Sequence, residues 1–145
     1  GKKIQTGIKI DFQKLASVAF ENEKNQKILN GIIWPEVSVL IKLSLEKANN
    51  ENYKYFIVDA ALLFEANFQH FFDYIILITA NKDIRLRRAV ERKNLDLSQI
   101  KKRMSLQISD KMKEKHSDFI VNNDSKIEDL EKEFNKIIKK LTWDR

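Results

Sequence analysis

The sequence predicts an α/β domain in which a parallel β-sheet is flanked by helices. Two continuous apolar runs, YFIV at residues 55–58 and YIILIT at residues 74–79, have the length and composition of strands covered on both faces. Segments with apolar residues at helical spacing precede the first run, follow the second and end the chain. Strands that alternate with helices are typical of parallel sheets, so we expect this architecture.

The length and composition fit one globular domain. The chain has 145 residues, enough for a single core but little room for two. It is 43% hydrophobic and 33% charged, with three glycines and one proline, which is a helix-rich balance and not a disordered one. No internal repeat or low-complexity linker interrupts it. We therefore expect one domain spanning residues 1–145.

Helices are expected before residue 50. Asp11 is placed to cap the start of a helix, and a second, short helical stretch covers residues 28–33. Pro35 suits the first turn of a long third helix, where its missing N–H costs nothing. The residues expected on the inner faces of the first and third helices are Phe12, Leu15, Ala16, Ala19 and Phe20, and then Val37, Leu40, Ile41, Leu43 and Leu45.

The predicted core follows. About a dozen residues lie between the two strands, room enough for a crossover between parallel neighbours. Asn81 is expected to cap a helix after the second strand. Residues 119–121 read as a short third strand, and residues 127–141 as a final amphipathic helix.

The segment from Asp96 to Ser117 is different in character. It is helical by propensity, but it is polar and carries only a thin apolar stripe of Ile100, Met104 and Ile108. A helix this polar is exposed or forms an excursion from the domain. In an enzyme that binds nucleotides, such a segment would be the lid.

Composition excludes some classes of function and leaves others open. With no cysteine, disulfides and thiolate metal sites are excluded, and a zinc site on two distant histidines is not expected. The longest apolar run is far shorter than the ~18 residues of a membrane span, so we expect no membrane partner and a cytoplasmic location. The net charge of +6 fits either a lysine-rich soluble surface or a polyanionic partner.

Asp59 directly follows the first predicted strand. Ligands of open α/β sheets gather outside the carboxyl ends of the strands, so this carboxylate is a candidate to hold Mg²⁺ through water. It is equally well explained as a strand-ending residue that caps the next turn.

Four arginines gather on the helix that follows the second strand. Arg88 and Arg92 are four residues apart and therefore share a face, which Arg85 approaches from one turn earlier. Guanidinium groups match phosphate oxygens well, so we expect Arg88 and Arg92 to contact phosphate, whereas Arg87 fits a solvated face. Arg103 and Gln107 are also four apart on the predicted lid helix, where a solvated face is the simpler interpretation. The phosphate-loop motif G-x-x-x-x-G-K-[ST] does not occur in the sequence.

Several of these segments together resemble the dephospho-CoA kinase family. Residues 57–65, IVDAALLFE, are similar to its V-x-D-x-P-L-L-F-E block, and residues 85–92 to its arginine helix Q-L-x-R-L-x-x-R, with Arg88 and Arg92 at the two arginine positions. Arg103 and Gln107 match R-x-x-x-Q of the lid, and residues 117–122, SDFIVN, resemble A-D-x-V-I-x-N. Residues 10–37 are similar to the family's upstream helices.

The resemblance implies a P-loop-kinase-like fold and an ATP-dependent transfer of phosphate to the ribose 3′-hydroxyl of dephospho-CoA, with Mg²⁺ as cofactor. Residues 1–50 would form the helical acceptor subdomain, 51–94 and 117–145 the α/β core, and 95–116 the lid. Arg88 would be catalytic. Nucleotide or phosphate contacts would come from Arg88, Arg92, Arg103, Gln107 and Asn122, with Lys113 a further lid residue; the acceptor side would be lined by Asp59, Leu62, Leu63, Phe64 and Glu65.

The chain also departs from the family pattern. Ala61, Trp34 and Phe12 stand where the family has Pro, His and Arg, and Arg85 replaces a Gln. The family's first strand, phosphate loop and the Asp that serves as base have no counterpart in these 145 residues. We therefore expect this chain to be inactive in phosphotransfer by itself. The alternatives are a non-catalytic nucleotide- or anion-binding module on the same fold, and a basic nucleic-acid-binding protein; no recognised nucleic-acid motif supports the last.

Overall fold

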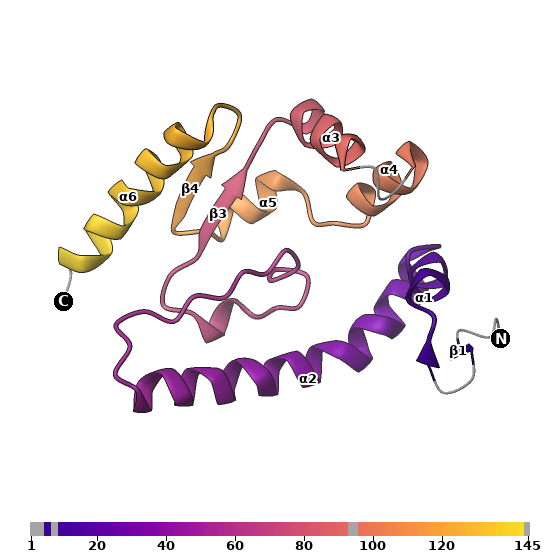
Figure 1. The fold of residues 1–145 in the computed structure, drawn as a ribbon, viewed down its shortest axis with the longest axis horizontal. Coiled ribbons are helices and arrows are strands. Elements are labelled where there is room, and N and C mark those ends of the chain that lie inside the picture. The colour runs from indigo at the N-terminus through magenta and orange to yellow at the C-terminus, as the bar shows by residue number, and fades with distance from the viewer. Residues whose placement is uncertain (1–4, 7–8, 93–95, 144–145) are drawn as a thin grey trace. The chain divides into compact units, whose positions relative to one another are not determined.

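The structure is a computed structural model, which describes residues 5–6, 9–92 and 96–143 (Figure 1). The chain divides into two compact units, Gly1–Phe68 and Gln69–Arg145.

The first unit opens with a short antiparallel pair and a capped helix. Strand β1 (Gln5–Thr6) pairs with β2 (Lys9–Ile10), a pair that sequence reasoning did not predict. Helix α1 (Phe12–Ala19) begins where expected, because the carboxylate of Asp11 accepts hydrogen bonds from two backbone N–H groups of the first turn. Its inner face was predicted less well, since Phe12 is 75% exposed and Ala19 is the buried residue.

Helix α2 (Glu23–Asn50) is one continuous helix of 28 residues. The prediction of two helices separated at Pro35 is therefore wrong: the proline lies inside α2. Pro35 lacks the backbone N–H that would bond to the carbonyl of Gly31, and a proline ring inside a helix crowds the carbonyl four residues before it. The helix ends at Asn50, and two residues later the chain passes through a left-handed residue, Asn52 (φ 58°), where Tyr53 N–H bonds to Ala48 O and Asn52 N–H to Asn49 O.

The sides of α2 are more exposed than expected. Ile41 is buried, but Leu40 and Leu43 are 61% and 56% exposed, so their predicted inner placement is wrong. Because the helix joins several short apolar runs, it is long and apolar enough to cross a membrane by length and composition, with a mean hydropathy of 1.5 over its most apolar window. Core helices of soluble proteins pass the same test. The absence of a membrane partner therefore stays a prediction.

Residues 55–58 form no strand, which corrects the sequence prediction. No described residue pairs its backbone with residues 55–60. A strand exists only through hydrogen bonds to a neighbour, and local apolar character does not supply one. The chain then makes a helical turn: Ala66 N–H bonds to Leu62 O, and the turn closes at Asn67 (φ 56°) with Phe68 N–H bonded to Leu63 O.

The second unit is built on a parallel two-stranded sheet. After a 3₁₀ turn, η1 (Gln69–Phe71), strand β3 (Ile76–Thr79) pairs in parallel with β4 (Phe119–Asn122), with Ile76 opposite Phe119 and Thr79 opposite Asn122. The strands predicted at residues 74–79 and 119–121 are thus confirmed with slightly shifted ends. The parallel sheet flanked by helices confirms the predicted fold class.

The described part of this unit also holds the helices α3 (Lys82–Glu91), α4 (Leu97–Ser105), α5 (Asp110–Lys115) and α6 (Ile127–Trp143), of which α5 packs against β3 and α6 against β4. Figure 1 shows α6 alongside β4, against which it packs, while α3 packs on α4. The buried apolar residues of this unit are Ala80, Ile100, Val121 and Ile137. The polar segment predicted as a lid is helical, but it divides into α4 and α5.

Candidate functional site

The carboxyl ends of β3 and β4 form the edge at which the candidate site lies. The strands are parallel, so Thr79 and Asn122, their last residues, lie side by side. The backbone N–H of Asn123 continues the ladder by donating to Thr79 O over 2.7 Å. Ligands of open α/β sheets bind at this edge.

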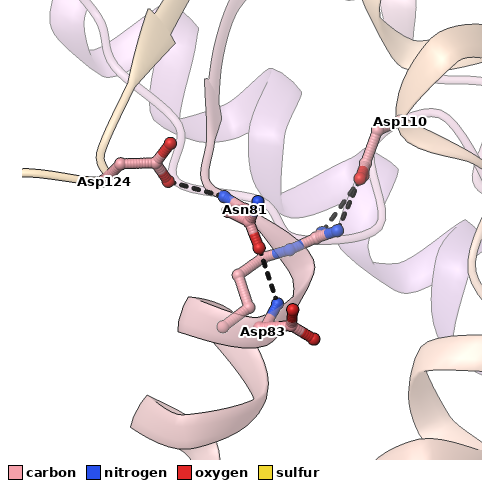
Figure 2. A network of polar contacts seen from close by, with 5 residues as sticks. Asn81, Asp83, Asp110 and Asp124 are labelled. Carbon is pink, nitrogen blue, oxygen red and sulfur yellow. Dashed lines mark hydrogen bonds and ion pairs between the residues drawn. The ribbon is translucent and has the colours of Figure 1, made fainter.

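A chain of polar contacts fixes the turns that leave this edge (Figure 2). Asn81 N–H donates to the Asp124 carboxylate over 2.6 Å, and the Asn81 side-chain oxygen accepts from Asp83 N–H over 2.9 Å as the cap of α3. The predicted cap is therefore confirmed. On the β4 side, the Asn122 side-chain oxygen accepts from Asp124 N–H over 2.8 Å. The start of α3 is thus tied to the end of β4.

Arg88 reaches back from α3 to the same edge. Its Nη1 donates to the carbonyl oxygen of Asn123 over 2.7 Å, so the structure brings Arg88 beside the loop that follows Asn122. The guanidinium has more N–H donors than this bond uses, and the side chain is half-buried. Arg92, the residue that ends α3, is exposed one turn further on. An anion at this edge would therefore meet an oriented guanidinium at Arg88 and a solvated one at Arg92.

The other two arginines of α3 form ion pairs. Arg85 makes a two-pronged contact with the Asp110 carboxylate at the start of α5, with Nη1–Oδ1 3.1 Å and Nη2–Oδ2 2.5 Å. Arg87 Nε lies 3.9 Å from Glu91 Oε1, and both side chains are about two-thirds exposed, as expected for a solvated face. Of the four arginines of the predicted basic helix, Arg85 and Arg88 are therefore half-buried, and Arg87 and Arg92 are exposed.

The lid residues are placed differently from the prediction. Arg103 lies in the last turn of α4 and is half-buried, but Gln107 is exposed in the turn that follows. The expectation that both lie on one helix is therefore wrong, because α4 ends at Ser105. The next residue, Leu106, bonds through its N–H to Arg103 O, and Gln107 N–H bonds to Met104 O. Lys113 of α5 is 8% exposed, which makes it part of the packing of this unit.

Asp96 is the N-cap residue of α4, at the start of the predicted lid segment. Its carboxylate caps α4, and a hydrogen bond from the Ser98 hydroxyl at 2.7 Å, helped by the backbone N–H of Gln99, holds the pKa of Asp96 below its usual value. Sequence reasoning identified the segment but not this cap. The signal was available, because Asp followed by a helical stretch is a helix-start pattern.

The predicted acceptor residues lie in the first unit. Asp59 is exposed in the segment without regular structure. Leu62, Leu63, Phe64 and Glu65 are half-buried in the helical turn that Asn67 closes. They form a local group, whereas the predicted phosphate-binding residues Arg88, Arg92, Arg103, Gln107 and Asn122 belong to the second unit.

The described residues do not by themselves build a metal site. Within residues 5–6, 9–92 and 96–143, no three His, Cys, Asp or Glu side chains gather closely enough to hold an ion. Mg²⁺ often needs few protein ligands beside a bound phosphate, but the Asp59 carboxylate alone does not define such a site. The residues present thus do not fit a Mg²⁺ site of their own.

Sequence reasoning missed Asp110, Asn123 and Asp124, which hold Arg85, Arg88 and Asn81 respectively. The run Asn122-Asn123-Asp124 after an apolar strand was a usable signal, because polar residues at a strand's carboxyl end mark the ligand edge. Asp110 gave no such signal, since its partner lies 25 residues away.

Comparison with known proteins places this chain among one enzyme family. The family model described as dephospho-CoA kinase matches residues 2–129. The dephospho-CoA kinase of Rickettsia prowazekii is 32% identical over 131 residues, covering 90% of this chain and 68% of that protein. The Fusobacterium nucleatum dephospho-CoA kinase is 34% identical over 121 residues, covering 83% of this chain and 61% of that protein.

A solved structure agrees. The dephospho-CoA kinase from Campylobacter jejuni matches with a TM-score of 0.62 and 30% identity, over 97% of this chain and 70% of that one. The chain therefore spans about two thirds of the length of the relatives that it matches. Sequence motifs, fold and family model agree, and the chain belongs to the dephospho-CoA kinase family.

Proposed function

We propose that this chain supplies the acceptor segment, the arginine helix and the lid of an enzyme that phosphorylates the ribose 3′-hydroxyl of dephospho-CoA with ATP, in the last step of coenzyme A synthesis. The observation that carries the proposal is Arg88, a half-buried guanidinium bonded to Asn123 O at the carboxyl edge of β3 and β4, in a chain of this family. We assign the enzyme to the cytoplasm.

The reaction sets what Arg88 has to do. The 3′-hydroxyl oxygen forms a bond to the γ-phosphorus of ATP, the bond to the β,γ-bridging oxygen breaks, ADP leaves, and the hydroxyl proton is released. Negative charge spreads over the transferring phosphoryl oxygens. A guanidinium already oriented by the Asn123 carbonyl needs little rearrangement to donate to those oxygens, which is the basis of electrostatic catalysis.

Arg92, Arg103, Gln107 and Asn122 are the further nucleotide-side residues of the proposal. Arg92 shares its helix with Arg88 and is exposed, so it is suited to an outer phosphate. Arg103 and Gln107 stand at the end of α4 and just after it, where a closing lid would bring donors to the nucleotide. Asn122 lies at the ligand edge itself.

The acceptor side is proposed to consist of Asp59, Leu62, Leu63, Phe64 and Glu65. The half-buried Leu62, Leu63 and Phe64 sit in a turn whose backbone bonds fix their positions, which suits contact with the flat apolar faces of a nucleoside. ATP is used with Mg²⁺ by enzymes of this chemistry. The described residues build no Mg²⁺ site of their own, so Asp59 stays only the candidate from the sequence and no step is assigned to it.

The 145-residue chain is proposed to bind substrates without transferring phosphate. The phosphate-loop motif does not occur in its sequence, so the backbone cradle that would hold the ATP β- and γ-phosphates is not encoded in these residues. Formation of ADP and coenzyme A by this chain with ATP, Mg²⁺ and dephospho-CoA would contradict this part of the proposal. The intact mass of the purified protein establishes which molecule was assayed.

A titration separates the proposal from its two alternatives. Binding of dephospho-CoA, ATP and a short oligonucleotide is measured by calorimetry at two salt concentrations. The kinase assignment predicts that dephospho-CoA binds. A module that only binds anions is expected to bind ATP and inorganic triphosphate, and to show no preference for dephospho-CoA over them. A nucleic-acid-binding protein shows oligonucleotide affinity that falls steeply with salt.

A further inference from the structure

Two helices of the second unit are joined by one two-pronged ion pair. Arg85 of α3 directs both terminal nitrogens at the Asp110 carboxylate of α5, at 3.1 and 2.5 Å. The side chains are 33% and 41% exposed, so the pair is partly shielded from water. Figure 2 labels Asp110 and marks the two contacts of its carboxylate with dashed lines. Fork-like arginine–carboxylate geometry distinguishes this contact from an ordinary surface ion pair.

Helix α5 depends on contacts of this kind. It has six residues, and an isolated helix of that length is not stable in water. Ser109, at its N-cap, gives it no side-chain cap among the described residues. At the other end, Lys113 is buried, its carbonyl accepts from the Ser117 hydroxyl over 2.7 Å, and α5 packs against β3. At the Asp110 end, the backbone N–H groups of Met112 and Lys113 bond to Ser109 O, and Arg85 adds the ion pair that joins this end to α3.

The same helix α3 is held on a second side. Arg88, three residues after Arg85, donates to Asn123 O at the end of β4. Residues three apart on a helix lie on neighbouring faces, so α3 carries one arginine directed to the sheet edge and one directed to α5. Any displacement of Asp110 thus acts on the helix that presents the phosphate-binding arginine.

We propose that Arg85 and Asp110 are a positioning pair that anchors the C-terminal end of the lid segment to the arginine helix. The lid segment is then tied to α3 at two places, through the packing of α4 on α3 and through the Arg85–Asp110 pair at α5. The pair thereby fixes the C-terminal end of the lid segment relative to Arg88. The role of this segment as a lid rests on the proposed function, whereas the anchoring of α5 does not.

The test is amide hydrogen exchange on the full chain, followed by mass spectrometry of peptides that cover Asp110–Lys115. Asp110→Asn and Arg85→Gln are each expected to speed exchange in α5 by about tenfold while β3, β4 and α6 keep their protection. Asp110→Glu keeps the carboxylate and is expected to retain most of the protection. Arg85→Lys keeps the charge but loses the fork and is expected to fall between.

Two further variants make the result decisive. The double variant Asp110→Asn/Arg85→Gln is expected to exchange no faster than either single variant, because one shared contact is lost once. Arg87→Gln removes a neighbouring arginine whose ion pair is exposed and is the matched control, expected to leave α5 unchanged. Unchanged α5 exchange in both single variants, or additive effects in the double, overturns the anchor. If Asp110→Asn does not fold, the test is the comparison of α5 exchange rates between Arg85→Lys and Arg87→Gln.

A nucleotide readout connects the anchor to the proposed function. Asp110→Asn is expected to weaken ATP binding severalfold, because α5 and α3 are no longer held in register. Tighter ATP binding by Asp110→Asn would overturn the positioning role, since it would make Asp110 a competitor of phosphate for Arg85. Failure of every form to bind ATP would refute the proposed function and leave the exchange result to decide the anchor.

Discussion

The backbone N–H of Asn81 donates to the Asp124 carboxylate over 2.6 Å, joining two residues 43 positions apart. Asn81 caps α3 through its side chain, so the same residue starts the arginine helix and ties it to the end of β4. The placement of Arg88 at the sheet edge therefore depends on a turn that is held at both ends.

Asp124→Ala is expected to destabilise the protein by about 1 kcal/mol, because the Asn81 N–H loses its acceptor. Asp124→Asn keeps a side-chain oxygen and is expected to cost less. Urea denaturation followed by circular dichroism measures both. Equal stability of the alanine variant and the parent protein would show that the bond does not contribute.

Pro35→Ala is expected to stabilise α2, by up to about 3 kcal/mol if the missing hydrogen bond to Gly31 O is regained. Gly31→Ala tests the same turn, since a Cβ at position 31 meets no heavy atom within 4 Å, and is expected to add about 1 kcal/mol. Both are measured by chemical denaturation. A loss of stability with Pro35→Ala would mean that the proline fits a conformation that alanine does not hold.

Asn67 has a left-handed backbone at φ 56°, a conformation that costs ordinary residues about 1–2 kcal/mol. Asn67→Ala is therefore expected to destabilise the turn that carries Leu62 to Phe64, and Asn67→Gly to be neutral or stabilising. Thermal unfolding compares the two variants. A lower melting temperature for glycine than for alanine would contradict the assignment of this turn.

Asp11 gives a pH-dependent prediction. The backbone N–H of Lys14, together with that of Gln13, holds the pKa of Asp11 below its ordinary 3.8. The ionised form is thus favoured in the folded state, so its contribution is complete above the ordinary value and is lost as the pH falls through the lower folded pKa. Carboxyl titration by NMR measures it. Asp11→Asn retains an accepting oxygen and is expected to remove this pH dependence of α1.

Features set by neighbouring residues were predictable from the sequence. The caps at Asp11 and Asn81 were predicted because a cap acts within its own first turn. The strands expected at 74–79 and 119–121, observed at 76–79 and 119–122, were predictable because their apolar runs are continuous, and the final helix because its apolar residues recur at helical spacing.

Features that depend on residues distant in the sequence were not predictable from it. Residues 55–58 have strand composition, but a strand needs a pairing neighbour that local sequence does not specify. Pro35 was taken as a helix start, although a helix favoured on both sides continues through the loss of one hydrogen bond. Arg88 was predicted as a phosphate ligand from its spacing, but its bond to Asn123 required the path of the chain between α3 and β4.

The central claim is that Arg88 is the phosphate-binding arginine of this chain, and ATP binding tests it most directly. The dissociation constant for ATP is measured by calorimetry for the parent chain, Arg88→Gln and Arg87→Gln, with thermal unfolding as a check on folding. Loss of a charge-assisted bond to phosphate is expected to weaken binding by about 10- to 100-fold in Arg88→Gln. Arg87, on the exposed face of the same helix, is expected to be replaceable without effect. Equal ATP affinity of the two folded variants would contradict the account.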